Sequence, residues 1–471
     1  MIKRSKFIFS KPFQLTRMAL VLSPFILAAC SFEQYLAKPI DPAVNIAHFD
    51  QKDPTSKGFN DFLISQGYQA NQLPISAWGL EELTYCALYF NPNLALARAQ
   101  WQAAEASAAS SNESTIPRIN ANLARSNDPD PAKKPYSLGF NIDLTADIAN
   151  KRGLRTESAQ HLAKAAELAI AQTAWQLRDK LAQSLLDYQY NQEKINLLSL
   201  EKNHQQVIVG IYQKRLDLGA ASNIEVSMAK RQLQTNAALL NQATQAQLSL
   251  KNQLASHMGI PVSRLEKMPL KLSASMPENA NWPSSDLQKH ALLNRTDLRI
   301  ALEQYAAKEA KLKLEIAKQY PDLTISPGYA YEFADSVWSL GVSGLLSMLN
   351  KNKLAIAEAR QLREVEATQF EALQTKIIGE AYATNAARLQ TQEMLKNQQA
   401  ALKEQRSYER RMVSLFAAGE IDRLALTLTQ IETVAIEKSA AAAQHDLNTA
   451  IRQLENTLQK PLTGSGVKHE P

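Results

Sequence analysis

The chain contains an internal repeat of about 200 residues. Residues 87–117 align without a gap with residues 291–321, so a segment near the start recurs in the second half. The identical pairs are Ala87/Ala291, Leu88/Leu292, Leu94/Leu298, Ala97/Ala301, Gln100/Gln304, Ala103/Ala307, Glu105/Glu309, Ala106/Ala310 and Pro117/Pro321. The correspondence continues with small slips to Gly219/Gly419 and Leu254/Leu454. A unit of this length is too long for a solenoid repeat. The sequence therefore predicts two copies of one large substructure, related by a pseudo-symmetry axis.

Residues 1–29 have the pattern of a cleaved lipoprotein signal peptide. A basic start precedes the apolar stretch Met18–Leu27, which is too short to span a bilayer. The stretch ends in Leu27-Ala28-Ala29-Cys30, and small residues directly before a cysteine resemble a lipobox. We therefore expect Cys30 to be the acylated first residue of the mature chain, and Ser31 after it to permit transfer to the outer membrane. The alternative is an ordinary signal peptide with an incidental cysteine.

Removal of this segment changes the charge balance. The full chain has 52 Lys and Arg residues against 46 Asp and Glu residues, a net charge of +6. The signal contributes five basic residues, namely Lys3, Arg4, Lys6, Lys11 and Arg17. The mature chain is then nearly neutral, and its charge gives no support for a nucleic-acid partner.

The second cysteine, Cys86, has no partner for a disulfide once Cys30 carries lipid. It lies in the apolar helical stretch Leu83–Phe90, so we expect a buried structural thiol.

Long helical periodicity dominates both repeats. Apolar residues recur every three or four positions from about residue 154 to 216, and a second run follows Gly219. The same pattern lies on either side of Gly419. A helix of that length extends about 90 Å, which is typical of a coiled-coil-like assembly. The expected fold is therefore mainly α with a small β portion.

Between the short and long helices of each repeat the period changes from 3.6 to 2. Ile119, Ala121 and Leu123 alternate with other residues in the first repeat. Larger and smaller side chains alternate in the same way over Leu323–Phe333 and Trp338–Gly344 in the second repeat. Each repeat is thus expected to carry one β-hairpin whose strands are long enough to cross a membrane. The aromatic residues Tyr329, Tyr331, Phe333 and Trp338 suit an interfacial girdle. A hairpin of a soluble sandwich is the alternative.

Four strands cannot form a closed membrane barrel alone. Unpaired strand edges are not tolerated in hydrocarbon, and the smallest single-chain barrels have about eight strands. If the hairpins enter a membrane, the chain must therefore oligomerise. Two copies would supply eight strands, and three would supply twelve with a channel inside.

The predicted organisation has six parts. They are the signal peptide 1–29, an irregular N-terminal arm 30–80, repeat 1 at 81–262, a polar connector 263–285, repeat 2 at 286–461 and a tail 462–471.

This arrangement resembles the TolC family of outer-membrane efflux proteins. The resemblance covers about residues 80–461 and rests on the duplicated order of helix, hairpin, long helix, Gly turn and returning helix. It also rests on the turn phrases 216–222 and 416–420 and on the helix-end phrases 254–261 and 454–461. The phrases 91–101 and Lys151-Arg152-Gly153 are similar to the branch that exports heavy-metal cations.

The resemblance implies a homotrimer in the outer membrane. Each chain would give four strands to a twelve-stranded barrel and four helical columns to a periplasmic tunnel. The trimer would be the passive exit duct of a three-part pump, with a periplasmic adaptor and an inner-membrane transporter as partners. No cofactor is implied beyond the lipid on Cys30.

The two Gly turns would be the periplasmic tips that contact the adaptor. The tip residues expected to do so are Leu216, Gly219, Ala220, Ser222, Ala418, Gly419 and Glu420. Carboxylates just beyond the tips often line the tunnel mouth in this family, which makes Glu225 and Asp422 candidate gate residues. Ala425 and Leu428 stand where further acids would be expected, so this chain departs from the pattern there. An ordinary solvated helix position is the alternative for Glu225.

No pattern of residues indicates catalysis or a resident metal. None of the seven histidines lies three to five residues from another His or a Cys, and no phosphate loop or nucleophile elbow is present. Together with the resemblance, which implies a conduit, this absence leads us to expect that the chain is not an enzyme. The competing interpretation is a periplasmic coiled-coil structural or adaptor lipoprotein without a pore. Adaptors usually have one helical hairpin and a strand-rich domain, whereas this chain has two hairpins and four strands.

Overall fold

The computed structural model describes residues 33–127, 135–271, 284–332, 335–344 and 351–460. The chain divides into two compact units, residues 1–51 and residues 52–471. In the first unit, α2 (Pro42–Asp50) begins after Asp41, whose carboxylate accepts the backbone N–H of Ala43 at 2.8 Å. All the other elements belong to the second unit.

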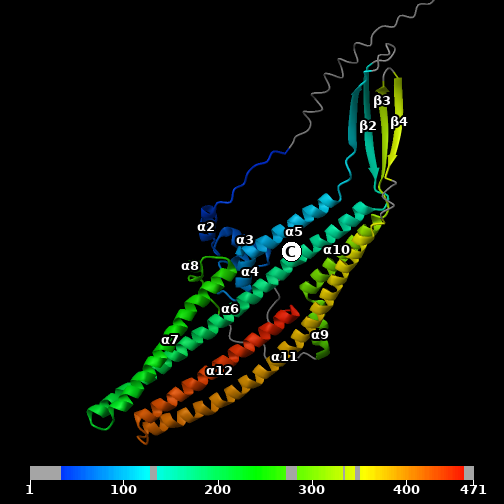
Figure 1. The fold of residues 1–471 in the computed structure, drawn as a ribbon. Coiled ribbons are helices and arrows are strands. Elements are labelled where there is room, and N and C mark those ends of the chain that lie inside the picture. Colours follow the sequence, from blue (N-terminus) through cyan, green and yellow to red (C-terminus); the bar gives the residue numbers. More distant parts are fainter. Residues whose placement is uncertain (1–32, 128–134, 272–283, 333–334, 345–350, 461–471) are drawn as a thin grey trace, which may run out of the picture. The chain divides into compact units, whose positions relative to one another are not determined.

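The second unit contains both repeats, and the elements follow the same order in each (Figure 1). Repeat 1 consists of α4 (Leu80–Phe90), α5 (Pro92–Ser111), β1 (Arg118–Arg125), β2 (Tyr136–Ala146), α6 (Lys151–Asp217) and α7 (Asn223–Met258). Repeat 2 consists of α9 (Ser284–Leu293), α10 (Thr296–Ala317), β3 (Leu323–Glu332), β4 (Asp335–Ser343), α11 (Lys353–Ala417) and α12 (Arg423–Leu458). The short helix α8 (Val262–Leu265) follows repeat 1. The predicted duplication and mainly helical fold are confirmed.

The long helices match closely between the repeats. Helices α6 and α11 have 67 and 65 residues, and α7 and α12 have 36 residues each. Helix α6 packs against both α7 and α12, and α12 packs against α11. At 1.5 Å per residue, α6 extends about 100 Å, so one helix connects the sheet to a distant turn.

The four described strands form one antiparallel sheet in the order β1-β2-β3-β4. Strand β2 pairs with β3, so the two hairpins join into one ribbon. Phe140 faces Tyr329 across this central pair, and Tyr329 faces Trp338 across the second hairpin.

The N-terminal segment 30–80 was expected to be irregular, and this expectation was wrong in part. It contains α2, α3 (Lys57–Ser65) and the 3-10 turn η1 (Ala70–Gln72). Phe59 and Leu63 of α3 are fully buried, in one hydrophobic cluster with residues of α4, α6 and α7. Trp78 stacks on Phe59 with ring centroids 6.2 Å apart. Helix α3 has only nine residues, so its apolar period is too short to stand out among the surrounding prolines.

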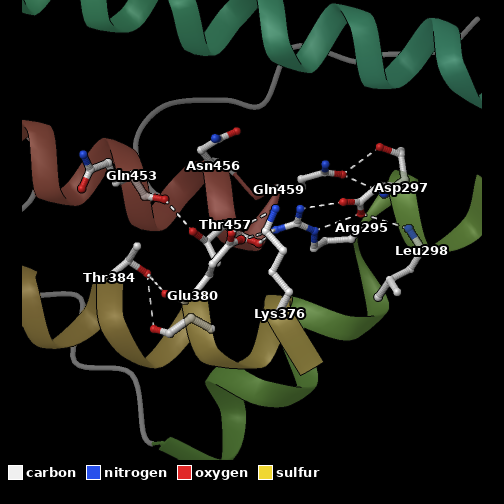
Figure 2. A network of polar contacts seen from close by, with 12 residues as sticks. Arg295, Asp297, Leu298, Lys376, Glu380, Thr384, Gln453, Asn456, Thr457 and Gln459 are labelled. Atoms are coloured by element: carbon white, nitrogen blue, oxygen red, sulfur yellow. Dashed lines mark hydrogen bonds and ion pairs between the residues drawn. The ribbon is translucent and has the colours of Figure 1, made fainter. Parts of the chain in front are cut away.

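In each repeat the residue that precedes the second helix donates a hydrogen bond to a carbonyl near the end of the last helix, but the donor group differs between the repeats. In repeat 1 the Asn91 amide at the start of α5 donates to the backbone carbonyl of His257 at 2.7 Å. In repeat 2 Arg295, which aligns with Asn91, donates to the carbonyl of Thr457 at 3.0 Å (Figure 2). The Arg295 guanidinium also donates two hydrogen bonds to the Asp297 carboxylate, at 2.6 and 2.9 Å. An amide and a guanidinium thus hold equivalent helix ends together.

Candidate functional site

Both tip turns are Schellman motifs built around a glycine. In the first, the N–H of Gly219 donates to the carbonyl of Leu216 at 2.9 Å, and the N–H of Ala220 to that of Arg215 at 2.7 Å. In the second, Gly419 and Glu420 donate in the same pattern, at 3.0 and 2.9 Å. Gly219 and Gly419 have φ angles of +71° and +79°, which glycine adopts without the steric cost of a Cβ.

The returning helices begin with different caps at equivalent positions. In repeat 1 the Ser222 hydroxyl accepts the N–H of Glu225 at 3.3 Å, and the Glu225 carboxylate accepts the N–H of Ser222 at 2.7 Å. In repeat 2 Asp422 is the N-cap and accepts the N–H of Ala425 at 2.8 Å. The acid thus stands at the third helical position in one repeat and at the cap in the other. Each supplies negative charge where the helix dipole favours it.

Glu225, one of the two candidate gate residues, caps the start of its own helix. The backbone and hydroxyl of Ser222 donate to its carboxylate, and these hydrogen bonds lower the pKa of Glu225. Both partners belong to its own turn. The Ser-x-x-Glu spacing of a capping box was readable in the sequence and is the simpler reason for an acid here.

The other candidate gate residue, Asp422, connects the two tips. Arg215, in the last turn of α6, donates to the Asp422 carboxylate at 2.7 Å. The hydrogen bond from the backbone N–H of Ala425 is the largest cause of the lowered pKa of Asp422, and the Arg215 guanidinium lowers this pKa further. This ion pair joins the end of one repeat's long helix to the start of the other repeat's returning helix.

Leu216 and Ala418 lie at the ends of α6 and α11. Leu216 is the helical residue whose carbonyl closes the first Schellman motif, and Ala418 is the C-cap of α11. Exposed apolar side chains lie around the first turn, namely Leu218 at 83% exposed and Ile224 at 71%. Beside them, a cavity of about 410 Å³ lies between α6, α7 and α12. Its lining includes Tyr212, Glu225, Met228, Leu428 and Ile431.

The sheet has two chemically different faces. Strand register places one set of apolar and aromatic residues side by side across all four strands. This set comprises Ile119, Ala121, Leu123, Leu138, Phe140, Ile142, Leu144, Ile325, Pro327, Tyr329, Tyr331, Trp338, Leu340 and Val342. Many of these side chains are strongly exposed in the single chain, from Trp338 at 81% to Val342 at 55%. We call this set the apolar face.

The opposite face carries mostly small and polar side chains. Asp143 accepts from Asn120, Asn141 and Ser326 at 2.9, 2.8 and 2.7 Å, which connects β1, β2 and β3. The sequence analysis did not single out Asp143, because its partners come from strands far apart in the chain. Nothing short of strand register could have predicted this network.

The aromatic residues predicted as a girdle lie towards the turn of the second hairpin. The Tyr329 ring lies 4.9 Å from the Trp338 ring and 5.9 Å from the Phe140 ring, by centroid distance. Tyr331 pairs with Ser336 one position further along the apolar face. Phe333 lies outside the described residues, as does Cys30.

The described residues contain no group of three His, Cys, Asp or Glu side chains that could hold a metal ion. Among these residues, no helix combines the length and apolar character that membrane crossing requires. Cys86 is fully buried, as expected, and burial raises the pKa of its thiol above the ordinary value.

The duplicated long helices and the four-stranded ribbon together define the fold of the TolC-like outer-membrane channels. The chain superimposes on the outer-membrane channel OprN with a TM-score of 0.66 at 19% identity, covering 81% of this chain and 90% of OprN. It superimposes on the Campylobacter jejuni CmeC outer membrane channel with a TM-score of 0.67 at 14% identity, covering 91% of this chain and 94% of CmeC. For CusC the TM-score is 0.66 at 16% identity, with 92% of this chain and 100% of CusC covered.

Residues 83–260, which lie within repeat 1, match the model of the outer membrane efflux protein family. A comparison with curated protein sequences gave no match.

Proposed function

We propose that this protein is the outer-membrane channel of an efflux pump, acting as a passive exit duct. The observation that carries the proposal is the exposed apolar face of a four-stranded ribbon attached to helices of 67 and 65 residues. An apolar face of this extent is stable in lipid and is a liability in water. The match of residues 83–260 to the outer membrane efflux protein family supports the same function.

The ribbon requires other copies of the chain. Strands β1 and β4 are the two edges of the described sheet, and hydrocarbon does not tolerate unpaired edges. Three copies would give twelve strands and a water-filled interior lined by the polar face around Asp143. We therefore propose a homotrimer, in which the exposed apolar residues of α7 and α11 also pack between copies. These include Met228, Leu239 and Leu248 on α7, and Val365, Leu389 and Met394 on α11.

The remaining partners follow from the proposed channel. The tip turns at Gly219 and Gly419 would contact a periplasmic adaptor, which in turn would connect to an inner-membrane transporter. The chain would not act as an enzyme. The cargo we propose is heavy-metal cations, on the similarity of residues 91–101 and Lys151-Arg152-Gly153 to that branch of the family. Such ions would pass through an aqueous bore without tight ligation.

Bilayer conductance distinguishes this function from a structural or adaptor lipoprotein. Purified protein should migrate as a trimer on an unheated detergent gel and should give discrete current steps in a planar bilayer. A monomer that stays soluble without detergent and gives no steps would overturn the proposal. For the cargo, a deletion strain should become sensitive to metal ions such as cobalt, zinc, cadmium, copper or silver. Sensitivity of the deletion strain to organic compounds alone would overturn the proposal that the cargo is heavy-metal cations.

The lipid on Cys30 is a separate proposal, based on the Leu27-Ala28-Ala29-Cys30 sequence. Replacing Cys30 with Ala should abolish incorporation of labelled palmitate and leave the precursor uncut. Unchanged labelling in this variant would contradict lipidation. Channel conductance does not depend on the outcome, since the barrel would itself anchor the protein.

A further inference from the structure

A basic cavity lies at the junction between the sheet and the helices. Its volume is about 570 Å³. Three chain segments line it: the link from α5 to β1, the link from β2 to α6, and the link from α10 to β3. The lining charged residues are Asp147, Lys151, Arg152, Arg155, Lys318 and Asp322. Four cations therefore face two carboxylates.

The two carboxylates are already engaged. Asp322 forms an ion pair with Lys151 at 2.9 Å. Asp147 accepts the backbone N–H groups of Lys151 and Arg152 at 2.9 and 2.7 Å and so caps the start of α6. Burial tends to raise the pKa of Asp147, but these backbone hydrogen bonds and the Lys151 charge outweigh it and hold the pKa below its ordinary value. Both carboxylates therefore already have partners within the junction.

Two guanidinium groups remain without a carboxylate. Lys318 is paired with Glu315 at 2.6 Å. Arg152 and Arg155 are exposed, and neither side chain forms an ion pair with any residue that the structure describes. They are three positions apart on α6, so they lie on one side of the helix. Guanidinium groups bind phosphate oxygens through paired N–H donors, which makes this pair suited to a phosphate-bearing ligand.

The location of the cavity indicates the source of the phosphate, provided that the proposed function holds. The cavity begins where the β2–β3 ladder ends, since Thr145 pairs with Thr324 and lines it. If the apolar face lies in hydrocarbon, the ends of the strands lie at the level of the lipid headgroups. Tyr320, which also lines the cavity and is 58% exposed, is a residue type enriched at that level.

The second repeat lacks this pair of arginines. Asn150 and Asn352 have equivalent left-handed conformations before α6 and α11, with φ angles of 53° and 44°. In this alignment Lys151 corresponds to Lys353, whereas Arg152 and Arg155 correspond to Leu354 and Ala357. Leu354 is 88% exposed, so an apolar side chain replaces the cation at the same kind of junction. The arginine pair is thus a feature of one junction per chain, not a requirement of the fold.

We propose that Arg152 and Arg155 bind the phosphate of an anionic phospholipid headgroup in the cavity at the β2–α6 junction, on the periplasmic side of the membrane. One such site would exist in each subunit. The lipid would hold the helical portion of the channel at a fixed height against the inner leaflet.

The test uses the full-length protein in detergent with short-chain phosphatidylglycerol, short-chain phosphatidylcholine and inorganic phosphate as probes. Native mass spectrometry measures the lipid retained per subunit. The wild-type protein should retain phosphatidylglycerol several-fold better than phosphatidylcholine. The double variant Arg152→Gln/Arg155→Gln should lose about tenfold in phosphatidylglycerol retention, in line with the loss of two charge-assisted contacts. Arg360→Gln, an exposed arginine on α11, is the control and should behave as the wild type does.

Three outcomes would overturn the proposal. Equal retention by the double variant and the wild type would remove the arginines from lipid binding. Displacement of the lipid by inorganic phosphate at equal concentration would assign the cavity to free phosphate. A less stable trimer with unchanged lipid retention would show that the arginines pair with carboxylates of a neighbouring subunit.

Conductance separates this proposal from the proposed function. The double variant should still give discrete current steps, because Arg152 and Arg155 belong to α6 and not to the strands that would form the barrel. If the wild-type protein gave no conductance, the proposed channel function would be wrong. Loss of lipid in the double variant with conductance retained would support the lipid site and would leave the channel function unaffected.

Discussion

Arg215 and Asp422 are 207 positions apart in the chain, yet their side chains meet at 2.7 Å between the two tip turns. Both side chains are partly exposed, so the pair contributes little to stability in itself. Its position matters more, because it connects the end of α6 to the start of α12. In a trimeric channel, three such pairs would restrain the tips relative to one another.

We predict that Arg215→Ala increases the fraction of time the channel is open, by a few-fold in planar bilayers, because it releases that restraint. Lys214→Ala is the matched control, since Lys214 is exposed and forms no ion pair within the described part of the chain. Equal open times for both variants would argue against a restraint at the tips.

The same pair predicts a pH dependence with a definite sign. The folded state lowers the pKa of Asp422 from 3.8, so its ionised form favours the folded contact. The contribution is complete above pH 3.8 and is lost as the pH falls through the lower folded pKa. Open time in the wild-type channel should therefore increase only below about pH 4. In Arg215→Ala this increase should be much smaller, and an equal increase would contradict the assignment.

The tip glycines give a stability prediction with an internal control. At Gly219 and Gly419 a new Cβ would meet no atom within 4 Å, so the positive φ is the only obstacle to alanine. Gly219→Ala and Gly419→Ala should each destabilise their hairpin by about 1–2 kcal/mol. Gly210→Ala, in the exposed interior of α6, should instead stabilise by roughly 1 kcal/mol. Urea unfolding followed by circular dichroism measures all three, and a stabilising change at either tip would refute the argument.

Much of the fold was predictable because it rests on long, regular patterns. The duplication, the Gly turns and the change of period from 3.6 to 2 each extend over many residues, so local propensity and tertiary structure agree. Helix α3 was missed because nine residues carry little periodic signal, although Phe59 and Leu63 are core residues. The position of this short helix depends on the burial of Phe59 and Leu63 against other helices, and nine residues of sequence do not show such contacts.

Among the candidate functional residues, contacts within a few positions could be predicted from the sequence, whereas contacts between distant positions could not. The Ser222–Glu225 capping box depends on a three-residue spacing and could have been read from the sequence. The contact of Asp143 with Ser326 could not, since 183 positions separate the two. The Arg215–Asp422 pair also depends on how the repeats pack, and the sequence analysis named Asp422 without a partner for it.

The two faces of the sheet predict opposite responses to a new charge. Leu340 is 70% exposed on the apolar face, and its neighbour Ser339 lies on the polar face. If the apolar face contacts lipid, Leu340→Lys should cost about 2–4 kcal/mol near the middle of the bilayer, whereas Ser339→Lys should be tolerated. The amount of heat-modifiable trimer in outer-membrane fractions measures this. A similar loss of trimer in both variants would mean that the two faces do not differ in their surroundings.

Asn236 of α7 is 2% exposed, and neither its amide nitrogen nor its carbonyl oxygen has a hydrogen-bond partner among the residues that the structure describes. A buried polar group without a partner costs about 1–3 kcal/mol. The second repeat has Ile436 at the corresponding position, 200 residues further along, so the chain itself shows an apolar side chain on the equivalent helix. Asn236→Ile should therefore raise the free energy of unfolding by about 1 kcal/mol or more. Asn241→Ile, at an exposed position of the same helix, should not raise it. Urea unfolding of both variants decides the matter: if Asn236→Ile destabilises the protein, the Asn236 side chain must be hydrogen-bonded, and α7 must pack differently around it.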